Sequence, residues 1–252
     1  MDHPGNFKDC HGGTMKIKII VPLVTDEYNA GIKKEVDRVK APDCSISIEN
    51  LKKGPCSIES RYDEFLAGPD MVKIACKAQD QGFDGIFIDC FGEPLVPVVR
   101  ELVDIPVIGG FGGAIMAANM ISQKFSIINV LDKVVAMNQT LVRNYGMVEN
   151  IASMPVIGMP VKELNDKKKL TERLVAVSLE AIDTHGAQAI VLGCTGMLDV
   201  AREVARILKE KGKPAPVIDP TTTAVTLLQS LIRNGLSQSR LTYSKPEEQK
   251  SL

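Results

Sequence analysis

Tryptophan is absent from the 252 residues, and there are only three histidines. Metal sites built from several histidines, and catalytic triads with a histidine base, therefore have few candidates. Cys10 with His3 and His11 could chelate a metal, but this segment is polar and Gly-rich, which is more typical of a flexible terminus. We therefore expect no metal site.

Long apolar runs and an excess of either charge are also missing. No stretch approaches about 18 apolar residues, so no transmembrane helix is indicated. Residues 1–14 lack the apolar core of a secretory signal, and we interpret them as a disordered extension. Lys and Arg number 30 and Asp and Glu 31, a net charge of −1 that gives no footprint for nucleic acid or an anionic membrane. The sequence predicts a cytoplasmic protein whose partner is a small-molecule substrate.

The six cysteines contain no Cys-X-X-Cys pair, which argues against a zinc knuckle or a thioredoxin motif. Thiols in the cytosol stay reduced, and most free cysteines are inert small hydrophobes. We interpret Cys44, Cys56 and Cys76 in this way, although Cys56 lies in a Gly-Pro loop that could border a site. Cys90 and Cys194 belong to a pattern of their own.

Short apolar runs alternate with amphipathic stretches, which indicates a mostly parallel sheet covered by helices. An α/β fold class is therefore predicted. The expected strands are 16–23, 45–49, 86–90, 106–109, 126–130, 155–158, 189–193 and 216–218. The expected helices are 26–40, 60–81, 94–102, 113–122, 133–146, 167–185, 197–211 and 222–234. Eight such units would also suit a TIM barrel.

An internal repeat favours two similar α/β halves over a barrel. The segment 82–92 parallels the segment 186–196, and each residue lies 104 positions before its counterpart. Each copy is followed by a helical stretch and by a second short strand of the form Pro-Val-Ile. Half-barrels can also repeat, so the repeat favours two lobes without excluding the barrel.

The repeat places Cys90 and Cys194 at equivalent positions, where a strand ends and a helix is expected. Ligands of open α/β sheets bind at the carboxyl ends of strands. A helix N-terminus presents free N–H groups and positive charge, which lowers the pKa of a nearby thiol. Gly92 and Gly196 let the backbone approach a ligand closely. We expect the two thiols to face each other across a cleft.

Facing thiols suit a two-base racemase. One thiolate removes the Cα proton, and the other thiol returns a proton to the opposite face. The groups must be chemically equal, because their roles exchange with the substrate enantiomer. Backbone N–H groups after each cysteine could hold the enolate-like oxyanion. This chemistry needs no cofactor, and none is expected.

These motifs resemble the aspartate/glutamate/hydantoin racemase superfamily, and specifically its hydantoin (allantoin) racemase branch. The resemblance covers nearly all of residues 15–236. It is carried by Gly54–Glu64, Cys90-Phe91-Gly92-Glu93-Pro94, Pro106–Gly109, Leu192-Gly193-Cys194-Thr195-Gly196-Met197 and Pro216–Asp219. It implies that Cys90 and Cys194 are the catalytic acid/base pair. It also implies two pseudosymmetric Rossmann-like lobes with parallel sheets, an active site between them, and a homo-oligomer.

By this resemblance, residues 15–113 form the first lobe and 216–236 complete it with the last strand and helix. Residues 114–215 form the second lobe, and 237–252 are a polar tail. The substrate-binding residues expected at strand ends are Pro22, Thr25, Phe91, Gly92, Thr195, Gly196 and Thr221. Thr221 follows Asp219-Pro220 and is also typical of a helix N-cap. Asp89 and Glu93 flank Cys90, where we interpret them as solvated, with Glu93 favourable at a helix start.

The residues beside the cysteines bear on the substrate. Relatives that act on free acidic amino acids tend to carry Cys-Asn-Thr and then Cys-Thr-Glu or Cys-Thr-His. Phe91 and Met197 suit a neutral ring better, such as a 5-substituted hydantoin or allantoin. The N-terminal loop, commonly Asn-Pro-Asn in the family, reads Val21-Pro22-Leu23 here, which leaves the exact substrate open. The alternatives are a racemase of free amino acids, an enzyme of the maleate isomerase or arylmalonate decarboxylase type, and a non-catalytic small-molecule binding protein.

Overall fold

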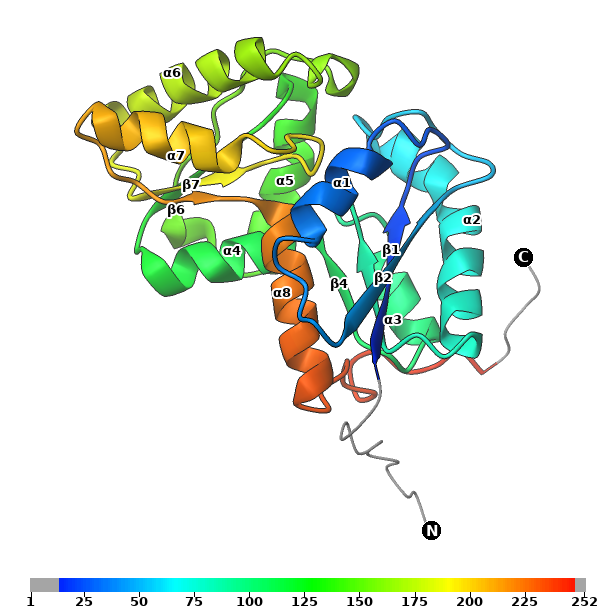
Figure 1. Ribbon diagram of the computed structural model, residues 1–252. Coiled ribbons are helices and arrows are strands. Elements are labelled where there is room, and N and C mark those ends of the chain that lie inside the picture. The colour runs from blue at the N-terminus through cyan, green and yellow to red at the C-terminus, as the bar shows by residue number, and fades with distance from the viewer. Residues whose placement is uncertain (1–13, 248–252) are drawn as a thin grey trace.

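Two parallel four-stranded sheets form the centres of two lobes (Figure 1) in a computed structural model that describes residues 14–247. The expected α/β fold with two lobes is confirmed, and the barrel is excluded. The first sheet has the order β2 (Cys44–Asn50), β1 (Met15–Val21), β3 (Gly85–Ile88) and β4 (Val107–Gly109). The second has the order β6 (Ile151–Ser153), β5 (Phe125–Ile128), β7 (Ala189–Leu192) and β8 (Val217–Ile218).

The central strands β3 and β7 are equivalent in the two lobes and completely buried. Helices cover both faces of each sheet, so an uninterrupted apolar run is the sequence pattern that such strands require. Cys90 and Cys194 each follow their strand by two residues. The repeat in the sequence is therefore a repeat of structure, and it brings the two cysteines to corresponding sheet edges.

Eight α-helices are present in residues 14–247. Their bounds are α1 (Asn29–Val36), α2 (Arg61–Asp80), α3 (Val96–Leu102), α4 (Gly110–Ile121), α5 (Asp132–Asn144), α6 (Lys167–His185), α7 (Ala201–Glu210) and α8 (Pro220–Arg233). Local signals explain several ends. The Asp166 side chain caps the start of α6, and Gly186 ends it in the left-handed conformation with φ of 70°. Asp219, rather than Thr221, caps α8.

The last strand and helix divide between the lobes. We expected 216–236 to complete the first lobe, but β8 pairs with β7 in the second sheet, so the strand assignment was wrong. Helix α8 then crosses over and packs against α4, α1 and β3 (Figure 1). The chain therefore passes between the lobes at both β4–α4 and β8–α8, and the paired helices α4 and α8 lie at their junction.

One expected strand is misplaced. Residues 155–158 form only an isolated bridge between Val156 and Asn129, and the edge strand β6 lies just before them. Pro155 has no N–H to donate to a ladder, which limits regular pairing at this edge.

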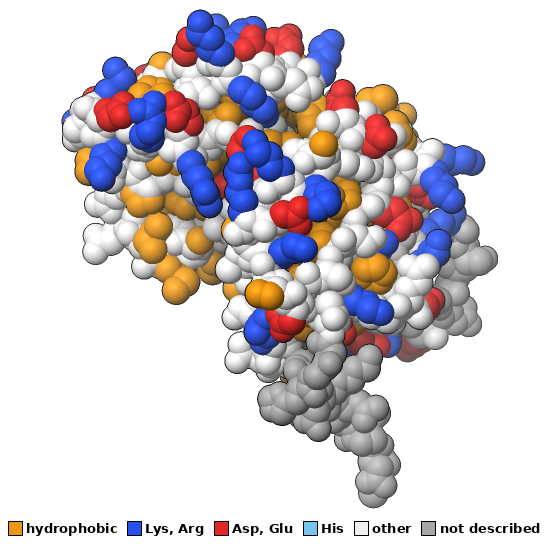
Figure 2. All heavy atoms as spheres, in the orientation of Figure 1, with side chains coloured by type: hydrophobic (Ala, Val, Ile, Leu, Met, Phe, Trp, Pro, Cys, Tyr) orange, Lys and Arg blue, Asp and Glu red, His pale blue; other side chains and the backbone are white. Residues whose placement is uncertain are grey.

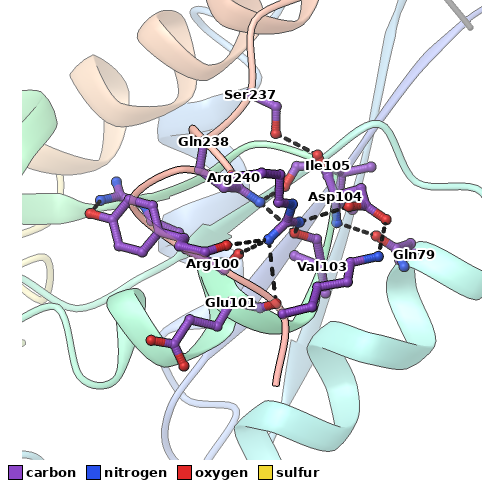
Figure 3. Close-up of polar contacts among 11 residues, drawn as sticks. Gln79, Arg100, Glu101, Val103, Asp104, Ile105, Ser237, Gln238 and Arg240 are labelled. Atoms are coloured by element: carbon purple, nitrogen blue, oxygen red, sulfur yellow. Dashed lines mark hydrogen bonds and ion pairs between the residues drawn. The ribbon is translucent and has the colours of Figure 1, made fainter. Parts of the chain in front are cut away.

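The expected polar tail does not trail away. Residues 237–247 return to the first lobe, where the Arg240 guanidinium donates to the carbonyl oxygens of Arg100, Glu101 and Val103 at the end of α3 (Figure 3). Arg240 also pairs with Asp104 at 2.8 Å. A cation is favourable at the unsatisfied carbonyls of a helix C-terminus, so the Arg240 side chain caps the C-terminus of α3. The rest of the tail, and residues 1–13 of the expected extension, lie outside the described residues.

Surface charge follows the near-zero net charge of the sequence. Figure 2 shows basic and acidic side chains mixed over the visible face of both lobes. Within residues 14–247, no helix combines the length and apolar character that crossing a membrane requires.

Candidate active site

Cys90 and Cys194 line one cavity between the lobes. Each comes from the loop after a central strand, Cys90 after β3 and Cys194 after β7. The two halves of the cavity share both cysteines together with Ile58, Val161 and Thr195. The structure thus brings the two thiols of the repeat into a single site.

The walls of this cavity are mainly apolar. The half nearer the first lobe is lined by Val21, Pro22, Leu23, Tyr28, Ile32, Ile58, Asp89, Val161, Thr195 and Gly196. The other half adds Phe91, Gly92, Val130, Val134, Met137, Asn138 and Gly193. Among these described lining residues there is no lysine or arginine, and Asp89 is the one acidic side chain.

The pKa of each thiol is raised rather than lowered. Burial is the main cause for both: it raises the pKa of Cys194 to about 11 and that of Cys90 further. The expected lowering of the pKa is not found, because burial outweighs the favourable backbone N–H groups and because no helix begins directly after either cysteine. Helix α3 begins at Val96 and α7 at Ala201, so the loops between carry the thiols away from the helix ends.

Backbone amides in these loops partly replace the helix termini. The Gly196 N–H donates to the Cys194 sulfur across 3.3 Å, and the Gly92 N–H acts in the same way on Cys90. Hydrogen bonds to sulfur favour the thiolate, so both amides lower the pKa against the effect of burial. These N–H groups therefore bond the sulfurs, and their expected contact with a substrate oxyanion stays a prediction.

Asp89 is buried and lines the cavity together with both cysteines, and it was not recognised from the sequence as a site residue. Its carboxyl accepts a hydrogen bond from the Thr221 hydroxyl at 3.2 Å, and its backbone oxygen accepts one from Thr195 at 3.3 Å. Burial raises the pKa of Asp89 to about 7. Its position directly before Cys90 in an apolar run was the available signal, since such a side chain cannot reach solvent.

Glu93 is also buried and joins the two lobes. Its carboxyl accepts the Gly112 N–H at 2.7 Å and the Tyr145 hydroxyl at 2.8 Å. Its φ of 52° lies in the left-handed region and turns the loop toward α4. The interpretation as a solvated helix start was therefore wrong. A Cβ on Gly109 would lie 2.4 Å from Glu93, so the glycine run 109–113 makes room for this contact.

A second link between the lobes closes the cavity near Cys194. The Val161 N–H donates to Glu59 at 3.1 Å, and the Tyr28 hydroxyl donates to the Val161 carbonyl at 3.3 Å. Glu59 also pairs with Lys133 at 2.6 Å. One residue of the second lobe, Val161, is thus held at both backbone groups by side chains of the first.

The expected substrate-binding residues divide into two groups. Pro22, Phe91, Gly92, Thr195 and Gly196 line the cavity. Thr25 instead accepts the Glu27 N–H in the turn before α1, and Thr221 is completely buried against Asp89. The other cysteines match their interpretation in part, since Cys44 is buried and Cys76 packs against buried apolar residues of the first lobe, while Cys56 is exposed.

A buried acid pair lies behind the site. Glu35 on α1 accepts the Asp199 N–H at 2.6 Å through one oxygen, whereas its other oxygen is buried without a partner. Burial and the nearby Asp219 carboxyl raise the pKa of Glu35 to about 9. Both acids line a separate cavity of about 450 Å³ between α1, α4 and the start of α8.

Comparison with known proteins agrees with this architecture. The family described as Asp/Glu/Hydantoin racemase matches residues 17–228. The chain belongs to this racemase family. It is 33% identical over 236 residues to the hydantoin racemase of Pseudomonas sp. (strain NS671), covering 93% of each chain. As a member of the family, it is an isomerase of the racemase class.

Solved structures of similar racemases share the fold. The allantoin racemase from Klebsiella pneumoniae superposes with a TM-score of 0.87 at 32% identity, covering 93% of this chain and 95% of that one. The allantoin racemase from Pseudomonas fluorescens gives a TM-score of 0.86 at 28% identity, with 94% and 100% coverage.

Proposed function

We propose that this racemase acts without a cofactor on a hydantoin-like ring, inverting the ring carbon that carries the substituent. The proposal draws on similarity to hydantoin and allantoin racemases and on the chemistry of the cavity. Its catalytic groups are Cys90 and Cys194, which line one cavity as the two halves of a repeat.

The observation that carries the choice of substrate is the lack of a cationic side chain among the described lining residues. A free amino acid or a diacid brings a carboxylate, and burying a carboxylate without a cation or several donors is costly. A hydantoin presents neutral ring amides and carbonyls instead. The apolar wall from Val21 to Leu23, with Ile32, favours an apolar 5-substituent over the polar ureido group of allantoin.

The reaction then needs one thiolate and one thiol. Cys194 carries the thiolate in the form that starts the cycle, since a backbone N–H bonds each sulfur but burial raises the pKa of Cys194 less than that of Cys90. The thiolate takes the proton from the substituted ring carbon, which the adjacent ring carbonyl acidifies. Cys90 delivers its proton to the other face, and the reverse reaction uses the opposite assignment.

A racemisation panel tests the proposal. Single enantiomers of 5-isobutylhydantoin, 5-benzylhydantoin, allantoin, aspartate and glutamate are incubated with the enzyme and followed by circular dichroism. We expect loss of optical activity with the apolar hydantoins, slower loss with allantoin, and none with the amino acids. Activity on the free amino acids alone would overturn the substrate assignment, and turnover of maleate or an arylmalonate would favour the alternative reactions.

A further inference from the structure

Each turnover of a two-thiol racemase leaves the enzyme in a different state from the one that began it. If Cys194 starts as the thiolate, the product departs with Cys194 protonated and Cys90 ionised. That form accepts only the product enantiomer. A proton must pass from Cys194 back to Cys90 before the next molecule of the first enantiomer can react. This requirement rests on the proposed two-thiol function.

We propose that Asp89 carries this proton between the two thiols of the empty enzyme. Asp89 lines the same cavity as Cys90 and Cys194, and it is only 5% exposed. It directly precedes Cys90, while the hydroxyl of Thr195, which follows Cys194, reaches its backbone oxygen at 3.3 Å. Asp89 is therefore held to both thiol-bearing loops.

The electrostatics support this role. The charge of Asp89 acts on both thiols and contributes to raising the pKa of each. Burial raises the pKa of Asp89 itself to about 7, with hydrogen bonds from threonine hydroxyls opposing the rise and Asp219 adding to it. A carboxyl that titrates near neutral pH can serve as acid and as base in one cycle.

The repeat provides only one such acid at these paired positions. Gly193 is the counterpart of Asp89, and a Cβ there would lie 2.5 Å from the Ile128 carbonyl oxygen. No side chain therefore fits beside Cys194 at that position. Asp89 thus has no counterpart in the other half of the repeat, yet it contacts the loops that carry both thiols. This position suits an acid that exchanges a proton first with one thiol and then with the other.

The step balances in two proton transfers. Asp89 as carboxylate takes the proton of the Cys194 thiol, which leaves the Cys194 thiolate and a carboxylic acid. The acid then gives that proton to the Cys90 thiolate. The result is Cys194 as thiolate, Cys90 as thiol and Asp89 as carboxylate, so no external acid or base is consumed.

The variant Asp89→Asn tests the proposal, because an amide of the same shape cannot transfer the proton. At low substrate concentration the relay is complete before the next substrate molecule binds, whereas at saturating substrate the relay limits the rate of turnover. We expect kcat to fall about tenfold or more, as for loss of a general acid or base. We expect kcat/KM to be unchanged or raised, because the loss of the Asp89 charge lowers the pKa of the thiols.

A tracer experiment gives a second readout on the same variant. In a concentrated racemate, conversion of one enantiomer leaves the thiols in the protonation state that accepts the other enantiomer. Reaction with that other enantiomer restores the first state, so label passes between the enantiomers without the relay. Asp89→Asn should therefore exchange labelled enantiomer in the racemate at a rate within about twofold of the parent, while net racemisation of a pure enantiomer stays slow.

Two further variants separate the relay from charge and from folding. Glu64→Gln also removes a charge that raises the Cys90 pKa, but Glu64 lies outside the lining of the cavity, so kcat should not fall. Thr221→Val removes the hydroxyl that donates to Asp89 and gives a milder change at the same carboxyl. We expect kcat to fall less than in Asp89→Asn, again without a matching fall in kcat/KM.

Equal losses in kcat and kcat/KM for Asp89→Asn and Thr221→Val would overturn the relay and leave Asp89 a structural residue. An unchanged kcat in Asp89→Asn would also overturn it. Failure of the proposed function is distinguishable, since the parent enzyme would then show no racemisation or Cα exchange with any hydantoin.

Discussion

Glu35→Gln should stabilise the enzyme at neutral pH, although it replaces a residue of the core. Glu35 is 3% exposed, one of its carboxyl oxygens accepts no hydrogen bond, and the Asp219 carboxyl at the N-cap of α8 raises its pKa further. The folded enzyme therefore keeps this group protonated at a pH at which the unfolded chain releases the proton. Glutamine keeps an acceptor for the Asp199 N–H and offers Asp219 a donor.

The magnitude follows from linkage. Burial and Asp219 raise the pKa of Glu35 from its ordinary value of 4.5 to about 9. A raised pKa means that the contribution to stability is full below 4.5 and is lost as the pH rises toward 9. Each pH unit in this window lowers the free energy of unfolding by about 1.4 kcal/mol, so the loss reaches about 3 kcal/mol at pH 7. Since Asp219 shares the buried proton, we expect a gain of about 1–3 kcal/mol from Glu35→Gln at pH 7.

Urea unfolding at pH 4.5 and pH 7 measures this effect. The free energy of unfolding of Glu35→Gln should exceed that of the parent at pH 7 and approach it at pH 4.5. Glu172→Gln on the exposed face of α6 is the matched control, with an expected change within about 0.5 kcal/mol at both pH values. Parallel pH profiles for the parent and Glu35→Gln, or a variant destabilised at pH 7, would refute the reasoning.

Two further substitutions test the links between the lobes. Tyr145→Phe removes the 2.8 Å hydrogen bond to the buried Glu93 carboxyl and should lower the free energy of unfolding by about 1–3 kcal/mol in the same urea assay; a change below about 0.5 kcal/mol would contradict this role. Glu59→Gln keeps an acceptor for the Val161 N–H but loses the ion pair with Lys133, so the cavity should open more often. Loss of about 1 kcal/mol corresponds to roughly fivefold faster alkylation of Cys194 by iodoacetamide, read by peptide mass spectrometry, and an unchanged rate would exclude a gating role.

Elements whose signal is local were predictable from the sequence. The helix 167–185 has an acidic cap before it and a glycine after it, and its predicted bounds are those of α6. The central strands were visible as buried apolar runs. The edge strand β6 and the path of β8 were not, because edge pairing and lobe exchange depend on tertiary contacts that leave no periodic pattern.

The candidate site divides in the same way. The repeat predicted that Cys90 and Cys194 would share one cavity, since equivalent strand ends meet where two similar lobes face each other. Burial of Asp89 and Glu93 was missed, because neighbours distant in the sequence enclose them: Thr221 binds the first, and Tyr145 and Gly112 bind the second. The thiol pKa was expected to fall because the two helices were predicted to start two and four residues too early and because the burial of the thiols was not foreseen.

The central claim is that two thiols act on opposite faces of one carbon, and Cα proton exchange tests it most directly. Each enantiomer of a 5-substituted hydantoin is incubated in deuterium oxide with Cys90→Ser and with Cys194→Ser, and deuterium at the ring carbon is measured by mass spectrometry. We predict that racemisation falls by at least about 10²-fold in both variants. We also predict that Cys90→Ser still exchanges the proton of one enantiomer and Cys194→Ser that of the other. Full racemisation by both serine variants would contradict the two-thiol mechanism.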